Sequence, residues 1–248
     1  MKVVFHDDFY QIYTADPASD AGRMEAVIDV IQSEVEFINA QPASPADIEA
    51  VHSSDHIEYV KRQGLYPIAS LAAGGAIQAA LIGLEEPCFG LIRPPGHHAS
   101  ASSCWGFCYF NNMVVALEHL KSQELISTAY VLDIDLHFGD GTVNILKGRD
   151  YVTVHNVAAN DRYSYLQEVR DEMEVCRADI IGISAGFDNH EDDWGGLLIT
   201  QDYFEIGSMV RAAADRNDSG CFAILEGGYN HSVLGHNVKA LITGLSKG

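Results

Sequence analysis

The sequence is poor in cationic side chains, with 15 Lys and Arg against 35 Asp and Glu and a formal net charge of −20. A surface this negative repels nucleic-acid phosphate and anionic lipid, so we expect neither nucleic acid nor a membrane as a direct partner. The apolar run at residues 1–5 is too short for a signal peptide, and no apolar run reaches the roughly 20 residues that a spanning helix needs, so we expect neither a targeting segment nor a membrane span. The charge favours cationic partners, although a solvated acidic surface explains most of it.

Paired cysteines are also absent. The five cysteines are odd in number and form no C-x-x-C motif, which predicts free thiols in a reducing compartment, the cytoplasm. There is no repeat, low-complexity tract or linker, so we expect a single domain over residues 1–248. With 47% apolar and 20% charged residues, the composition excludes disordered, collagen-like and coiled-coil proteins.

Short apolar runs alternate with segments that carry apolar residues at helical spacing. The runs predicted as buried strands are 3–5, 89–92, 129–135, 151–155, 180–184 and 221–225. The segments predicted as helices are 24–38, 71–84, 113–120, 165–176 and 203–214. This alternation predicts an α/β fold: a single-domain, open, mostly parallel sheet with helices on both faces.

Polar residues follow the predicted strands at the points where these strands end. The carboxyl ends of parallel strands meet at one edge of an open sheet, where ligand sites collect. We therefore expect the polar residues of five strand ends to lie close together. These residues are His97, His98, Asp133, Asp135, His137, Thr153, His155, Asp188 and Tyr229.

Asp135 and His137 lie two residues apart, on the same side of an extended chain. Together with Asp188 they form a set of one histidine and two carboxylates, which leaves a fourth position open as in catalytic zinc sites. The alternative for this motif is a hydrogen-bonded Asp and His at a strand end.

Two further motifs offer groups for proton transfer and for stabilising negative charge. His97 and His98 could each donate a ring proton to a buried carboxylate, with Asp133 and Asp140 as the available partners. Tyr229 follows a glycine turn, which suits a hydrogen-bond donor to a developing oxyanion. The alternatives are solvated loop histidines and a tyrosine that only packs.

Five motifs, taken together, resemble the zinc-dependent histone deacetylase and acetylpolyamine amidohydrolase family. They are R-P-P-G-H-H-A at 93–99, G-F-C-Y-F-N-N at 106–112, D-I-D-L-H-F-G-D-G at 133–141, A-G-F-D at 185–188 and E-G-G-Y-N at 226–230. The resemblance extends from about residue 50 to the C-terminus. It is specific because the motifs occur in the family's order, and it implies the arginase/deacetylase fold.

The resemblance implies two bound ions. Asp135, His137 and Asp188 would bind one Zn²⁺ per chain. A structural K⁺ would be bound by Asp133, the main-chain carbonyls of Asp135 and His137, and the hydroxyl of Thr153.

The resemblance also implies the groups that carry out the reaction. His97 and His98 would be the acid/base pair, oriented by Asp133 and Asp140 respectively, and Tyr229 would polarise the scissile carbonyl. The substrate channel would be lined by Phe107, Gly227 and Gly228.

The sequence departs from the family at the predicted mouth of the channel. Only Arg23 remains of the usual His-Pro-Glu-Arg stretch, and the usual aromatic-Pro-Gly-Thr-Gly loop is missing after His155. The second aromatic wall of the channel would then be missing, or it would come from Tyr163 or Trp194. Gly195 stands where polyamine-selective relatives have an acidic residue, which argues against a polyamine substrate.

The resemblance therefore predicts a metal-dependent deacetylase that hydrolyses a linear amide C–N bond and releases acetate. Its substrate would be acetyl-lysine in a protein or a small N-acetyl amine such as an acetylpolyamine. Two alternatives are an arginase-like hydrolase with two metals and a protein that binds acetylated amines without turning them over.

Overall fold

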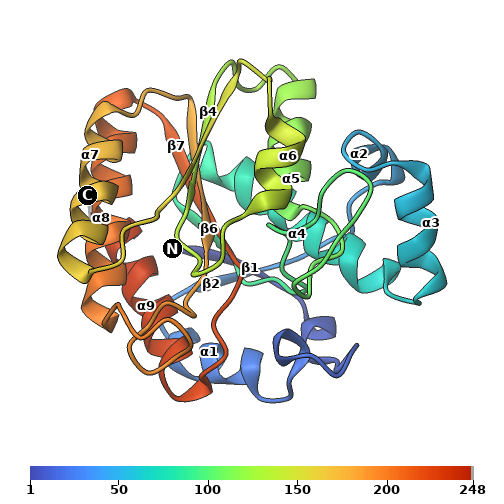
Figure 1. The fold of residues 1–248 in the computed structure, drawn as a ribbon, viewed down its shortest axis with the longest axis horizontal. Coiled ribbons are helices and arrows are strands. Elements are labelled where there is room, and N and C mark those ends of the chain that lie inside the picture. Colours follow the sequence, from blue (N-terminus) through green and yellow to red (C-terminus); the bar gives the residue numbers. More distant parts are fainter. Residues whose placement is uncertain (247–248) are drawn as a thin grey trace.

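The computed structural model describes residues 1–246, and within them seven strands form one open sheet in the order β2-β1-β3-β7-β6-β4-β5 (Figure 1). Every pair of neighbouring strands is parallel. The strands are β1 (Lys2–Phe5), β2 (Glu36–Asn39), β3 (Cys88–Gly90), β4 (Ala129–Asp133), β5 (Val152–Asn156), β6 (Ile180–Ala185) and β7 (Gly220–Leu225). The predicted fold class is confirmed.

Helices cover both faces of the sheet. Figure 1 shows α1, α7, α8 and α9 on one side and α4, α5 and α6 on the other, with α2 and α3 beyond α4. The α-helices are α1 (Arg23–Ile31), α2 (Pro45–Glu49), α3 (Ser54–Arg62), α4 (Tyr66–Gly83), α5 (Asn112–Ser122), α6 (Asp140–Leu146), α7 (Arg162–Val175), α8 (Thr200–Asn217) and α9 (His231–Ser246). Short 3₁₀ helices lie at Asp7–Tyr10 and Pro17–Ser19.

The central strands are apolar because they are covered on both sides. Every residue of β4, β6 and β7 is buried, whereas the edge strands β2 and β5 are partly exposed. Among the described helices, α4 alone is long and apolar enough to cross a membrane by length and composition. Because 72% of that segment is buried inside the protein, we interpret it as a core helix.

The predicted helix over 24–38 is wrong in its second half. Helix α1 ends at Ile31, and residues 36–39 form the edge strand β2, which pairs with β1. Three of the four residues of β2 are exposed, so this strand lacks the buried apolar run by which the other strands were predicted. Helices α2, α3, α6 and α9 were not predicted, although Ser44 and Ser53 provide N-cap signals for α2 and α3.

The chain order places the site at a reversal of strand order. Strands β3 and β4 follow each other in the sequence, but β7 and β6 lie between them in the sheet. The loops after these four strands therefore leave the same edge side by side, which is the usual position of ligand sites in open α/β sheets.

Candidate active site

Asp135, His137 and Asp188 converge beyond the ends of the neighbouring strands β4 and β6. One ligand atom from each of the three lies within 4.8 Å of those of the other two. His137 Nδ1 lies 3.0 Å from Asp188 Oδ2 and 3.3 Å from Asp135 Oδ1. Both carboxylates are buried and the imidazole is partly exposed. The predicted ligand set is thus brought together with one open side.

The electrostatics of this group fit a divalent cation. Hydrogen bonds to Asp135 and Asp188 raise the pKa of His137 to about 10. Burial, together with the charge of Asp135, raises the pKa of Asp188 to about 6. Two buried carboxylates beside one imidazole therefore concentrate negative charge at a point where a cation would relieve it, and N and O donors suit zinc and related ions.

Gly227 allows the ligands to approach each other. Its amide donates to Asp135 Oδ2 at 2.8 Å, and a Cβ added at this position would lie 2.6 Å from that oxygen and 2.8 Å from Asp188 Oδ2. Any side chain larger than hydrogen would thus displace the carboxylates. Gly227 lines the pocket and also shapes the metal-binding group, whereas Gly228, predicted to line the channel as well, is not among the lining residues.

The two histidines have the carboxylate partners that were predicted from the sequence. His97 Nδ1 lies 3.1 Å from Asp133 Oδ2, and His98 Nδ1 lies 2.7 Å from Asp140 Oδ1. The rings lie 4.0 Å apart and both are buried. Each carboxylate orients a ring so that the opposite nitrogen, Nε2, remains for other partners.

The histidines differ in proton affinity. Burial and the neighbouring His97 lower the pKa of His98 to about 4, although Asp140 opposes them. Burial also opposes protonation of His97, but Asp135 and Asp133 outweigh it and raise the pKa of His97 well above its ordinary value. One ring of the pair is therefore neutral at pH 7 and able to accept a proton.

Trp105 supports His98 in a way that the sequence analysis missed. Its indole ring stacks on the imidazole of His98 at 3.8 Å between centroids, and its Nε1 donates to both oxygens of Asp140. Gly106 makes this contact possible, because a Cβ there would lie 2.3 Å from His98 Cδ2. A tryptophan next to the G-F-C motif was the available signal.

Tyr229 and Phe107 face each other across the pocket. Their rings meet edge to face at 5.9 Å, and Phe107 adopts φ +67°, a left-handed conformation that costs a side-chain-bearing residue about 1–3 kcal/mol. The Tyr229 hydroxyl forms no hydrogen bond with any residue in 1–246, so it is available to a ligand. Burial raises the pKa of Tyr229, which keeps its hydroxyl protonated as a donor.

The second aromatic wall comes from Trp194. Its ring stacks on Tyr229 at 4.1 Å and lies perpendicular to His137 at 6.0 Å. Tyr163, the other candidate, is 78% exposed and does not line the pocket. Trp194 and Trp105 are both about half exposed and form the mouth.

The pocket has a volume of about 110 Å³ and is lined by Pro95, His97, His98, Trp105, Gly106, Phe107, His137, Trp194, Gly227 and Tyr229.

Arg23 lies beneath the glycine turn and does not line the pocket. Its guanidinium is fully buried and donates to the carbonyls of Glu226 and Gly228, at 2.7 and 2.9 Å. The same group lies 5.4 Å from the centre of the Tyr229 ring. Its contacts support the segment that carries Tyr229.

Glu226 is a second residue to which the sequence analysis gave no role. Its Oε2 accepts hydrogen bonds from the amides of Gly96, at 2.7 Å, and His97, at 3.1 Å. Burial raises its pKa to about 7. The carboxyl group thus holds the main chain that carries the histidine pair, and the E-G-G-Y motif was its only signal.

Thr153 is not brought to the other predicted potassium ligands. In the register of β4 and β5 it lies opposite Tyr130, whereas Asn156 lies opposite Asp133. Thr153 is thus three residues away from Asp133 along the sheet and is exposed. The prediction placed Thr153 too close to the strand end, because pairing register is not visible in a single strand. His155 is also directed elsewhere and contacts Glu168 at 2.8 Å.

A sequence model of the histone deacetylase domain matches residues 18–168 and 158–245. The chain belongs to the histone deacetylase family. It is therefore a hydrolytic deacetylase, as predicted, and Asp135, His137 and Asp188 are its candidate metal ligands.

Two curated relatives support the same family. A "Probable deacetylase" of Methanothermobacter thermautotrophicus is 30% identical and is aligned over 98% of this chain and 90% of its own length. A "Histone deacetylase-like amidohydrolase" of Pseudomonas aeruginosa is 29% identical over 90% of this chain and 74% of its own length. The first alignment spans 302 positions, more than the 248 residues of this deacetylase, so the relative has segments that are missing here.

The fold has a counterpart among solved structures. The crystal structure of the "HDA15 HD domain" superposes with a TM-score of 0.85, covering 98% of this chain and 88% of that chain. At 22% sequence identity, the likeness supports the fold alone.

Proposed function

We propose that this deacetylase uses one zinc ion to hydrolyse an N-acetylated amine, either acetyl-lysine in a protein or a small acetylated amine. The observation that carries the proposal is the convergence of three groups on one pocket. These groups are the candidate metal ligands, a carboxylate-paired histidine couple and a tyrosine with a free hydroxyl. One histidine and two carboxylates are a ligand set that suits zinc.

The residues of the chain have separate tasks in this mechanism. Zinc, when bound, supplies activation of water and polarisation of the carbonyl. His98 is neutral at pH 7 and accepts the proton of the attacking water, and it then returns a proton to the departing amine. Tyr229 donates a hydrogen bond to the oxyanion of the tetrahedral intermediate. Asp140 keeps the ring of His98 oriented during both transfers.

The alternative of a two-metal hydrolase has less support. A second metal needs further bridging carboxylates, and within residues 1–246 only Asp135, His137 and Asp188 form a group with metal-ligand spacing. His97 and His98 are committed to Asp133 and Asp140. We therefore expect a metal content near one zinc per chain.

A structural potassium ion stays a proposal with a smaller ligand set. Asp133 and the main-chain carbonyls of Asp135 and His137 remain its candidate ligands. Thr153 is no longer a candidate ligand, because it lies opposite Tyr130 and three residues from Asp133 along the sheet.

The test is acetate release by the purified, zinc-loaded protein from acetyl-lysine peptides and from acetylated diamines. We expect turnover of at least one class and a large loss in the variant Tyr229→Phe. If a ligand bound to the pocket and no acetate was released, the protein would be a binder of acetylated amines and the catalytic proposal would be wrong.

A further inference from the structure

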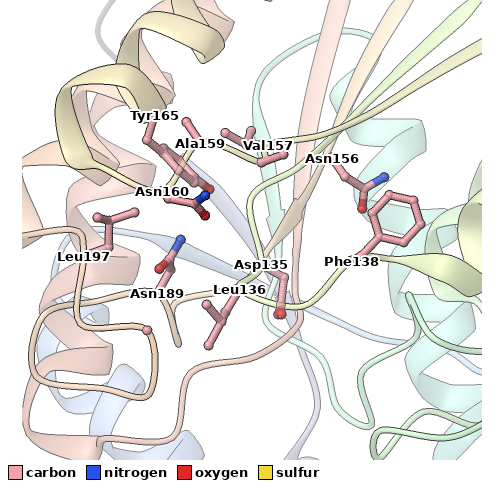
Figure 2. A pocket seen from close by; sticks show the side chains of 12 residues that line it. Asp135, Leu136, Phe138, Asn156, Val157, Ala159, Asn160, Tyr165, Asn189 and Leu197 are labelled. Carbon is pink, nitrogen blue, oxygen red and sulfur yellow. The ribbon is translucent and has the colours of Figure 1, made fainter.

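Asn156 is a polar residue near the site that the mechanism does not use. It is the last residue of β5, and in the register of the sheet it lies opposite Asp133, the last residue of β4. It does not line the catalytic pocket. Together with Leu136 and Phe138 it lines a second pocket of about 350 Å³, on the other side of the segment that follows β4 (Figure 2). Asn156 is therefore not placed to touch a substrate whose acetylated amine lies in the catalytic pocket.

The side chain of Asn156 accepts a hydrogen bond from the main chain of the loop between β4 and α6. The donor is the amide of Gly139, whose nitrogen lies 2.7 Å from Asn156 Oδ1. Gly139 is buried and is the N-cap residue of α6. Loss of the acceptor would leave a buried amide without a partner, which is unfavourable enough to displace the loop. Strand β5 thus holds this loop through one side chain.

Gly139 lies between the two histidine–carboxylate pairs. A Cβ added to it would collide with Asp133 Oδ2 and lie 3.2 Å from His97 Nδ1, so its Cα packs against the first pair. Its chain neighbour Asp140 is the partner of His98 in the second pair. A displacement of Gly139 would therefore reach both pairs, and it would move Asp140 most directly, through the peptide bond that joins the two residues.

We propose that Asn156 is a positioning residue for the reaction: it fixes Gly139, and thereby the place of Asp140 and the orientation of His98. The inference rests on the proposed deacetylase function, which assigns proton transfer to His98. Removal of an outer hydrogen-bond partner typically lowers activity about 10–100-fold, because the reacting groups are no longer held in the productive geometry. The hydrogen bond of Asn156 is made to a residue outside the metal-binding group, so we expect an effect on kcat and not on zinc binding.

Asn156→Leu removes the acceptor at nearly constant size, and acetate release from an acetyl-lysine peptide by the zinc-loaded protein measures the effect. We expect kcat to fall about tenfold, with KM within about twofold of the wild-type value and zinc content unchanged. Asn160→Leu is the matched control, because Asn160 is an exposed asparagine in the wall of the same pocket, and it should change none of the three. An unchanged kcat in Asn156→Leu, or an equal loss in both variants, would overturn the proposal.

Asn156→Asp separates the hydrogen bond from a merely structural role. A carboxylate keeps an acceptor in the same place, so kcat should return to within about threefold of the wild-type value. Asn160→Asp controls for the added charge. Asn156→Ala removes the acceptor without adding bulk and should match the leucine variant, so the test does not depend on tolerance of leucine. If Asn156→Asp lost as much activity as Asn156→Leu, the hydrogen bond would not be the cause and the proposal would be wrong.

The link from Asn156 to Asp140 can be followed by NMR without turnover. Trp105 Nε1 donates to both oxygens of Asp140, at 3.1 and 3.0 Å, so its indole N–H signal reports the position of that carboxylate. In Asn156→Leu this signal should shift, and the amide of Gly139 should exchange faster with solvent. The indole signal of Trp194, the other tryptophan, should remain in place. An unchanged Trp105 signal would contradict the proposal.

The two readouts distinguish this inference from the function on which it rests. If the zinc-loaded wild-type protein released no acetate, the deacetylase mechanism would fail, and the Trp105 signal would still test the link to Asp140. If the wild-type protein released acetate and Asn156→Leu kept its kcat while the signal shifted, the positioning role alone would be wrong.

Discussion

The floor and the mouth of the catalytic pocket are built in different ways. On the floor, the imidazoles of His97 and His98 are each paired with a carboxylate, and the main chain behind them is held by Glu226. At the mouth, Trp105 and Trp194 are about half exposed and stack on His98 and Tyr229 respectively, and Trp105 also donates to Asp140. We infer that hydrogen bonds with carboxylates hold the histidines of the floor in place, whereas exposed aromatic rings determine how a substrate enters the pocket.

Removal of a metal ligand should reduce activity more than any other change, and it leaves the residues of the mouth unaltered. Asp188→Ala leaves His137 and Asp135 without the third donor, so zinc content should fall from about one per chain to near zero. Activity should fall on the order of 10³-fold or more, because several kcal/mol of charge stabilisation are lost. Metal analysis of the purified variant and acetate release measure the two effects. Full zinc occupancy would contradict the ligand assignment.

Tyr229→Phe should separate catalysis from metal binding. Loss of one oxyanion donor typically lowers kcat by about 10²–10³-fold, and the ring that stacks on Trp194 is retained. Zinc content and the unfolding temperature should remain those of the wild-type protein. A fully active variant would show that the hydroxyl does not act on the oxyanion.

As the pH falls, the loop that carries Trp105 should lose stability before the strands beneath the pocket do. His52 fixes both ends of the loop that carries Trp105, since its Nε2 accepts from Asn111 N at 2.9 Å and its Nδ1 lies 3.1 Å from the Ser100 carbonyl. Burial lowers the pKa of His52 to about 3, so its folded form is neutral while an unfolded chain is protonated near pH 6.5. Between pH 6.5 and pH 3 the unfolded chain binds a proton at His52 that the folded protein does not. The stability that neutral His52 contributes above pH 6.5 is therefore lost as the pH falls towards 3.

This loss amounts to about 2 kcal/mol between pH 7 and pH 5. Hydrogen exchange should show lower protection in residues 99–111 at pH 5, after correction for intrinsic rates, while β4 and β6 change less. The variant His52→Gln should show a weaker pH dependence of the unfolding free energy. Equal pH dependence in both proteins would exclude His52 as the cause.

The smallest effect is expected at the mouth itself. Trp105→Phe keeps a ring over His98 but removes the indole hydrogen bond to Asp140, worth about 1 kcal/mol. We expect kcat to fall about fivefold with little change in KM, because His98 is less firmly oriented. Trp194→Phe is the matched control at the mouth, and it should change KM more than kcat. If Trp105→Phe altered only KM, Trp105 would be a channel wall and not a positioning residue.

The sequence predicted those parts of the site that depend on short motifs at the ends of buried strands. Asp135 and His137 are close in the sequence, and the motif that contains them ends a buried strand. Their place at the sheet edge therefore follows from the alternation of predicted strands and helices. The sequence offered Asp133 and Asp140 as partners for the two histidines, and the family resemblance implied that His97 pairs with Asp133. The structure has this contact. The deacetylase family was likewise recognised from five ordered motifs and is confirmed.

Features that depend on loop conformation or strand register were not predictable. The stacking of Trp105 on His98 requires the left-handed turn at Gly106 and Phe107, which no sequence pattern specifies. Thr153 was misplaced because the register of β5 against β4 depends on the whole sheet. Strand β2 was missed because an exposed edge strand needs few apolar residues.

Trp105 and Trp194 are the only tryptophans in the sequence. Their position at one opening means that the intrinsic indole fluorescence of the folded chain originates entirely from this opening. Emission from Trp105 depends on its contact with an imidazole, and emission from Trp194 depends on its contact with a phenol. The protein thus carries an optical reporter of its own entrance, and arrival of a substrate can be followed without a label.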